Sequence, residues 1–146
     1  MPITVTVHVE GLRELGEKMR LLDAKVSTRL ATRATGKAAN VIKKLAKQKI
    51  QSNPSIDTGS LLNSVIVKKI PKSQTSLTSE HIVTVRGRGK PKINKKGVKQ
   101  AQAPHASLVE YGTVKMKAEP YMRPAFDNGK AGALATIVET LRDGIK

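Results

Sequence analysis

The residues best suited to metal binding or catalysis are few and scattered along this chain. Its three histidines, His8, His81 and His105, lie on separate segments, and no two have the i, i+4 spacing that places both on one helix face. The chain has no cysteine, which excludes a thiolate zinc site and a cysteine nucleophile. We therefore predict no metal site and no cofactor.

The oxygen nucleophiles and carboxylates also lack a recognisable catalytic arrangement. There is no G-x-S-x-G elbow and no P-loop, and the glycines at 87 and 89 do not continue as a dinucleotide fingerprint. Asp57 and Glu110 are two carboxylates that could pair, but nothing in the sequence places them together. For Glu110 we expect a helix cap or an ion pair, for instance with Arg123. The sequence favours a protein that is not an enzyme, and a hydrolase with an unrecognised site is the weaker alternative.

Positive charge is the strongest global signal. The chain has 146 residues and a formal net charge of +16, which implies attraction to polyanions such as nucleic acid or an acidic protein. Residues 86–99 contain no acid and carry these cations: Arg86, Arg88, Lys90, Lys92, Lys95, Lys96 and Lys99. Glycine and proline interrupt them, which predicts a mobile basic loop at about residues 86–103. Two interpretations stay open: a solvated insertion, or an arm that contacts DNA phosphates or an acidic partner.

Hydrophobic periodicity predicts an α+β fold in a single domain, residues 1–146. Its main feature is a small, mainly antiparallel sheet packed against a long helix, with a C-terminal helix. Strict alternation predicts a strand at 3–9, and three- and four-residue steps predict helices at 12–22, 24–50 and 120–145. Residues 65–70 and 81–86 are expected to pair as an antiparallel hairpin, while 105–111 is either a strand or a helical turn. No apolar run reaches the roughly 20 residues of a membrane span, and the first ten residues do not resemble a signal peptide.

The three aromatic residues, Tyr111, Tyr121 and Phe126, all lie in the stretch 104–126. In so aromatic-poor a chain we expect them to fill the core, since aromatic side chains bury large areas. An exposed patch that receives a neighbouring subunit is the alternative. Prolines suit the first turn of a helix, so PYMRPAF is predicted to begin the C-terminal helix, with Tyr121, Met122 and Phe126 packed against the body.

Three short motifs in series resemble the head–tail joining family of long-tailed bacteriophages, also called tail-completion or neck proteins. They are the IDTGSL, HASLVEYGT and PYMRPAF segments. Their matching positions imply structural or interface roles for Asp57, Thr58, Gly59, Glu110, Tyr111, Gly112, Thr113, Tyr121, Arg123, Pro124 and Phe126. The resemblance extends in order from Gly11 to the end of the chain, and the basic stretch near 86–100 departs from it as an enlarged loop.

This resemblance implies a structural virion protein that joins head to tail as part of a ring of identical subunits. Its partners would be other phage neck and tail proteins, with no membrane, and a transient contact with genomic DNA stays open. Its place would be the neck or tail of the virion, and the host cytoplasm during assembly. The alternative function is a nucleic-acid-binding protein without sequence specificity, in which the basic surface itself is the functional element.

Overall fold

The computed structural model describes residues 11–22, 24–53, 58–71, 79–87, 93, 97–99 and 102–146. The strand predicted at 3–9 lies outside these residues and stays a prediction. So does most of the basic loop, including Arg88, Lys90, Lys92, Lys95 and Lys96, and so does Asp57.

The predicted α+β fold is confirmed by the described elements. In chain order they are α1 (Leu12–Arg20), α2 (Ala24–Gln51), α3 (Thr58–Ser64), β1 (Val65–Lys69), β2 (His81–Val85), α4 (Ala106–Tyr111) and α5 (Met122–Ile145). Residues 105–111, for which the sequence left a strand and a helical turn as alternatives, thus form the helix α4. Gly36 does not interrupt α2, which runs for 28 residues.

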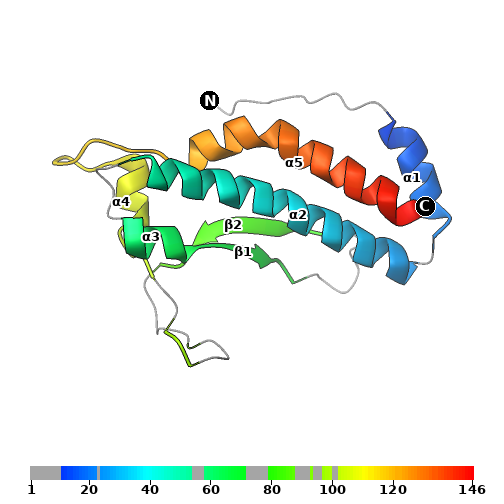
Figure 1. Ribbon diagram of the computed structural model, residues 1–146, viewed down its shortest axis with the longest axis horizontal. Helices are drawn as coiled ribbons and strands as arrows, with labels where there is room; N and C mark the ends of the chain where they lie inside the picture. Colours follow the sequence, from blue (N-terminus) through cyan, green and yellow to red (C-terminus); the bar gives the residue numbers. More distant parts are fainter. Residues whose placement is uncertain are drawn as a thin grey trace.

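Helices α2 and α5 form one layer, in which they lie side by side and antiparallel (Figure 1). Glycines of α5 allow a close approach to α2: a Cβ at Gly129 would lie 2.6 Å from Ile42 Cδ1 and 2.6 Å from Leu45 Cδ1. Near the other end of α5, a Cβ at Gly144 would lie 2.1 Å from Leu30 Cδ1. The predicted apolar stripe of α2 packs here, except that its first member, Val26, is 47% exposed.

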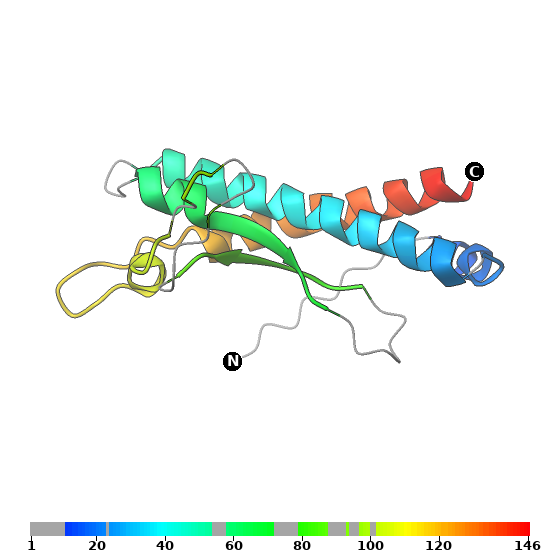
Figure 2. The same ribbon diagram turned by 90° about the horizontal axis from the view of Figure 1, so that it is seen from below.

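The hairpin β1–β2 forms the second layer, on one side of the helices (Figure 2). Its strands are antiparallel, with Val65 opposite Val85 and Lys69 opposite His81. Both strands pack on α2. Because side chains alternate along a strand, Val83 and Val85 face the helices while Thr84 faces away.

Among the described residues, most of the buried apolar side chains form two clusters. The larger lies where α2 meets α3, α4 and the start of α5, and includes Ile50, Leu61, Val65 and Tyr121. The smaller joins α1 to the opposite end of α2 and α5 through Leu15, Leu30, Ala34 and Leu141. The larger cluster is the one that supports the motif-bearing stretch 104–126.

Candidate assembly surface

Glu110, at the end of α4, caps the N-terminus of α5. Its Oε2 accepts hydrogen bonds from the backbone N–H groups of Tyr121 (2.8 Å) and Met122 (2.9 Å), and its Oε1 accepts one from Arg123 (3.0 Å). A carboxylate at this position also faces the positive end of the helix dipole. The predicted cap is confirmed. The alternative, an ion pair with the Arg123 side chain, is not among the ion pairs of the described residues.

Pro124 completes this arrangement. The first N–H groups of a helix have no partner within it. Here the Glu110 carboxylate accepts hydrogen bonds from the N–H groups of residues 121–123. Pro124 has no N–H, and the Ala125 N–H donates to Tyr121 C=O at 3.3 Å. The spacing between the HASLVEYGT and PYMRPAF motifs therefore has a physical reason. Glu110 of the first motif accepts hydrogen bonds from the backbone N–H groups at the start of α5 in the second.

Gly112 and Thr113 build the turn that lets Glu110 reach α5. Gly112 has φ 75°, and a Cβ there would lie 2.7 Å from Ala118 N and 2.9 Å from Met116 O. No residue with a side chain fits so tight a space, and positive φ favours glycine. Thr113 then pairs with Met116 as a β-bridge, and its Oγ1 accepts a hydrogen bond from Met116 N–H at 3.0 Å.

Tyr121 is the aromatic anchor of the larger core cluster, as predicted. Its side chain is 2% exposed, and its hydroxyl donates to Ala106 C=O at 3.4 Å. Burial, with the nearby Glu110 carboxylate as the next cause, raises the pKa of Tyr121 to about 12. The neutral phenol is thus the form that the folded chain holds.

The core prediction is wrong for the other two aromatic residues. Tyr111 is 70% exposed and Phe126 is 57% exposed. Helix α4 is only six residues long, and Tyr111 is its last residue, on the side away from buried Ala106. Phe126 follows buried Ala125 and so falls on a different face of α5. The Arg123 guanidinium lies 5.9 Å from the centroid of the Tyr111 ring, within the range of a cation–π contact.

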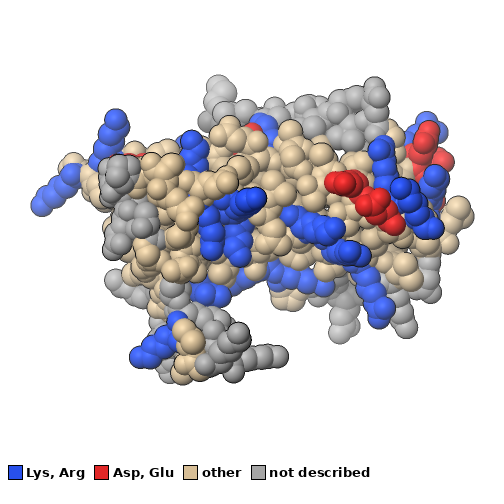
Figure 3. Space-filling view, in the orientation of Figure 1, with Lys and Arg blue, Asp and Glu red and all other residues tan. Residues whose placement is uncertain are grey.

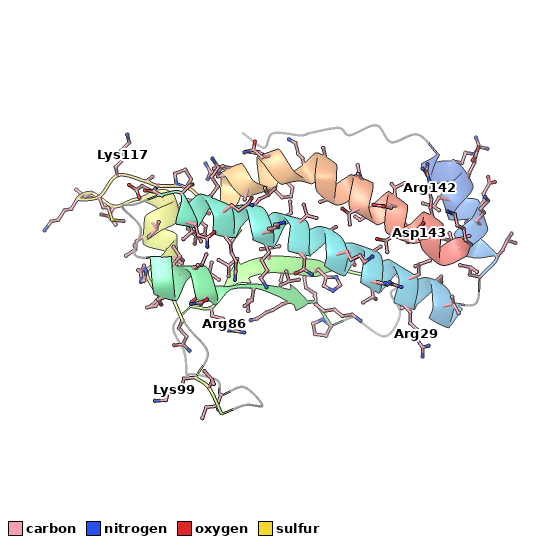
Figure 4. The ribbon with its side chains drawn as sticks, viewed as in Figure 1. Arg29, Arg86, Lys99, Lys117, Arg142 and Asp143 are labelled. Atoms are coloured by element: carbon pink, nitrogen blue, oxygen red, sulfur yellow. The ribbon has the colours of Figure 1, made fainter. Side chains whose placement is uncertain are left out.

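Exposed apolar side chains extend from Tyr111 along the turn that follows. We name as the tip surface the exposed apolar side chains of residues 108–116, which are Leu108, Tyr111, Val114 and Met116. Exposed Lys115 and Lys117 accompany them, and Lys117 lies at the far end of the molecule (Figure 4). The sequence motifs pointed to Tyr111 here but not to its three apolar neighbours, whose exposure depends on the tertiary fold.

An apolar groove of about 810 Å³ lies between β2 and α5, and Tyr111 of the tip surface also lines it. Ala38, Ala39 and Ile42 of α2 line it, together with residues of β2 and with Phe126 and Ile137 of α5. Single exposed apolar residues are common on protein surfaces, but a continuous apolar hollow indicates a binding region.

The basic-loop residues that the structure describes are not brought together. Arg86 is half-buried at the end of β2, where its N–H donates to Ser64 C=O at 3.0 Å. Lys99 is exposed in the projecting loop, well away from Arg86 (Figure 4). The structure therefore shows no joint cationic site for this pair.

A second basic region lies on α2, and its residues were not among the candidate contact residues predicted from the sequence. This helix contains no Asp or Glu, and its cations are Lys25, Arg29, Arg33, Lys37, Lys43, Lys44, Lys47 and Lys49. On the face drawn in Figure 3, Lys and Arg side chains spread over this helix, whereas acidic side chains gather near α1 and the C-terminal end of α5. Partial burial, and then the neighbouring Lys43, lower the pKa of Lys47.

Helix α3 begins within the IDTGSL motif, at Thr58. Gly59 and Ser60 lie in its first turn, where Ser60 Oγ donates to the carbonyl of Gln102 and Gly59 C=O accepts from the Asn63 side chain at 2.9 Å. Leu61 is fully buried in the larger cluster. These contacts give the segment a structural part, because they join α3 to the chain that precedes α4.

In the described part of the chain, Ser79 and His81 both contact Thr35, whose Oγ1 lies 3.2 Å from Ser79 Oγ and 2.9 Å from His81 Nδ1. No group of three or more His, Asp or Glu residues suited to a metal ion occurs there. His81 has a local structural contact: its Nδ1 lies 2.9 Å from Thr35 Oγ1, and its ring packs against Gly36. This contact joins the start of β2 to α2.

Comparison with known proteins gives one family match. Residues 13–112 fit the model of the family described as "Bacteriophage HK97-gp10, putative tail-component". The chain belongs to this bacteriophage family. Neither the curated proteins nor the solved structures gave a match.

The family match ends at Gly112, just after Tyr111, so PYMRPAF lies beyond it. The hydrogen bonds of Glu110 connect the matched part to that segment. Family membership identifies the protein as a phage tail-component type, which is a structural class of the virion. Among the described helices, none is long and apolar enough to cross a membrane.

Proposed function

We propose that the protein is a neck or tail-completion component that joins the phage head to the tail as a ring of identical subunits. Family membership supports a structural role in the tail. The neck position and the ring are our extension of it, from the resemblance of the three motifs to head–tail joining proteins. In this role the protein acts by surface complementarity and carries out no reaction.

The tip surface is the observation that carries the proposal. A chain with three aromatic residues leaves Tyr111 70% exposed, although exposing an aromatic side chain forgoes much of the hydrophobic stabilisation available to the fold. The Glu110 cap and the Gly112 turn fix the chain on both sides of it. Rigid aromatic side chains contribute strongly to interfaces because little conformational entropy is lost when they bind.

The charge beside the tip surface indicates the chemistry of the partner. Lys115 and Lys117 flank the apolar side chains, so the matching surface would be apolar at its centre and acidic at its rim. The cations of α2 and of the basic loop offer a further contact, either with acidic subunits or transiently with genomic DNA.

Electron microscopy of the purified protein, mixed with the neck and tail proteins encoded beside it, tests this function. We expect rings with the parent chain and a loss of rings with the double variant Tyr111→Ser/Val114→Ser. Leu21→Ser is the matched control, since Leu21 is 88% exposed at the α1 end of the molecule. Thermal melting should be nearly unchanged in both variants, because surface substitutions alter stability little. Rings that form equally well with the double variant would refute the proposed use of the tip surface.

A further inference from the structure

The apolar groove lies where the described part of the sheet, β1 and β2, leaves the helical layer uncovered. Neighbouring helices are about 8–10 Å apart and neighbouring strands about 4.8 Å apart, so a two-helix layer needs more than two strands to cover it. Both strands pack on α2, and α5 packs mainly on α2 and α1. The face of α5 that carries Phe126 and Ile137 therefore lines the groove.

Among the residues that the structure describes, β1 pairs with one edge of β2, and no strand pairs with the other edge, which lies beside this groove. Arg86 N–H donates to Ser64 C=O, and Ile70 N–H donates to Glu80 C=O, both at 3.0 Å. In an antiparallel pair such bonds recur at every second residue, so the N–H and C=O groups of His81, Val83 and Val85 point away from β1. Within the described part of the chain, no backbone hydrogen bond joins these outward groups to another segment.

We propose that residues 3–9 of the same chain occupy this position as a third strand, antiparallel to β2, and close the groove. An open strand edge over an apolar hollow is a template for strand addition. The proposal does not depend on the neck function, because it concerns the subunit itself.

The sequence of this segment has the pattern that the position requires. Ile3, Val5, Val7 and Val9 alternate with Thr4, Thr6 and His8. In a third strand the first set would face the helices, as Val83 and Val85 do, and the second set would extend the outward face that carries Thr84. A shift of one residue would bury the threonines, so only every second register is compatible.

The segment also has the necessary reach and direction. It precedes Gly11, where an added Cβ would lie 3.2 Å from the Arg142 side chain near the end of α5. Seven extended residues span about 23 Å, which matches the roughly 24 Å from residue 142 of α5 back to residue 126. Since β2 begins beside Gly36 and runs with α2, a segment that runs with α5 is antiparallel to β2.

The same distances select a register. Ile137 and His81 line the groove together, and Ile137 is about 7.5 Å along α5 from Arg142, or about two strand residues. Counting back from Gly11 places Val9 opposite His81 and Val7 opposite Val83. Thr6 then faces Thr84 as a pair without hydrogen bonds, for which the Cα atoms are about 4.5 Å apart.

Disulfide trapping in the full chain tests the third strand directly, because the chain has no cysteine of its own. We expect the double variant Thr6→Cys/Thr84→Cys to form a disulfide within one chain under mild oxidation, since the Cα separation suits such a bond. Val7→Cys/Thr84→Cys is the matched control, and its thiols would lie on opposite faces of the sheet. We expect that pair to stay reduced. Non-reducing electrophoresis and mass spectrometry of proteolytic fragments identify the products.

Each outcome decides the proposal. An intrachain disulfide with Thr6, or with Thr4 or His8 after a two-residue shift, supports it, provided that the Val7 control stays reduced. A disulfide between two chains would overturn the assignment to the same chain and show strand exchange with a second copy. Failure of Thr4, Thr6 and His8 variants to link to Thr84, with a parent-like circular dichroism spectrum, would refute the strand. Protection of the Val83 amide from hydrogen exchange, lost on deletion of residues 1–9, provides a second readout without cysteines.

Discussion

Glu110 is the residue on which the conformation of the stretch 104–126 depends. Replacing it with alanine removes the three hydrogen bonds that its carboxylate accepts from the backbone N–H groups of residues 121–123. We expect Glu110→Ala to lower the free energy of unfolding by about 1–3 kcal/mol. Chemical denaturation measures this, with Glu139→Ala as the control, since Glu139 is exposed on α5. Equal stability of the two variants would contradict the cap.

Tyr121 makes stability depend on pH in the alkaline range. Its pKa is raised to about 12 in the folded chain, against about 10 for an unperturbed tyrosine. Above pH 10 the Tyr121 hydroxyl loses its proton in the unfolded chain but keeps it in the folded chain. The contribution of this group to the free energy of unfolding is therefore fully present below pH 10 and is lost as the pH rises towards 12. The slope due to this group is at most about 1.4 kcal/mol per pH unit.

We expect Tyr121→Phe to remove this contribution, so its stability should fall less steeply between pH 10 and 12 than that of the parent. Tyr111→Phe is the control, because Tyr111 is largely exposed. Lysine deprotonation affects all three proteins alike, and denaturation curves at several pH values isolate the difference. A Tyr121→Phe profile parallel to the parent would disprove the assignment.

The close contact between α2 and α5 depends on glycines. We expect Gly129→Val to destabilise the fold by about 1–3 kcal/mol, since its branched side chain would enter the space of Ile42 and Leu45. The same change at Gly132 is the control: that residue is exposed, and a Cβ there would lie 3.9 Å from Val41 Cγ1. Thermal melts of the two variants should therefore differ clearly. Similar melting temperatures would show that the helices can separate without cost.

Helices α1, α2 and α5 and the hairpin could be predicted from the sequence because each has a regular apolar period, whereas α3 was not predicted and α4 was left open between a strand and a helical turn. The predicted helical stripe from Leu30 to Leu45 and the alternation around Val83 depend on local spacing, which side-chain burial then follows. The Glu110 cap was expected as one of two possibilities, because the sequence offers this carboxylate no set of catalytic partners.

The exposure of Tyr111 and Phe126 could not be predicted in the same way. Hydrophobicity favours burial of both, and the choice of Tyr121 alone depends on which face of α4 and α5 meets the core. That choice is a tertiary effect, invisible in residue type or spacing. The groove likewise depends on how the two described strands lie over the two helices, which is a tertiary arrangement.

For the whole molecule, the net charge of +16 predicts general attraction to polyanions. We expect DNA binding to be weak, independent of sequence and steeply reduced by salt, because phosphate contacts release counterions. Fluorescence anisotropy with two unrelated duplexes at increasing salt concentration measures this. A preference for one duplex that survives raised salt would contradict purely electrostatic binding.

The location of the protein in the virion tests the central claim most directly. Immunogold electron microscopy of intact particles, with an antibody raised against this chain, detects that location. A neck or tail-completion component predicts label at the junction of head and tail, at a constant number of copies per particle. Label along the tail tube, at the distal tip, or absent from purified particles would contradict it.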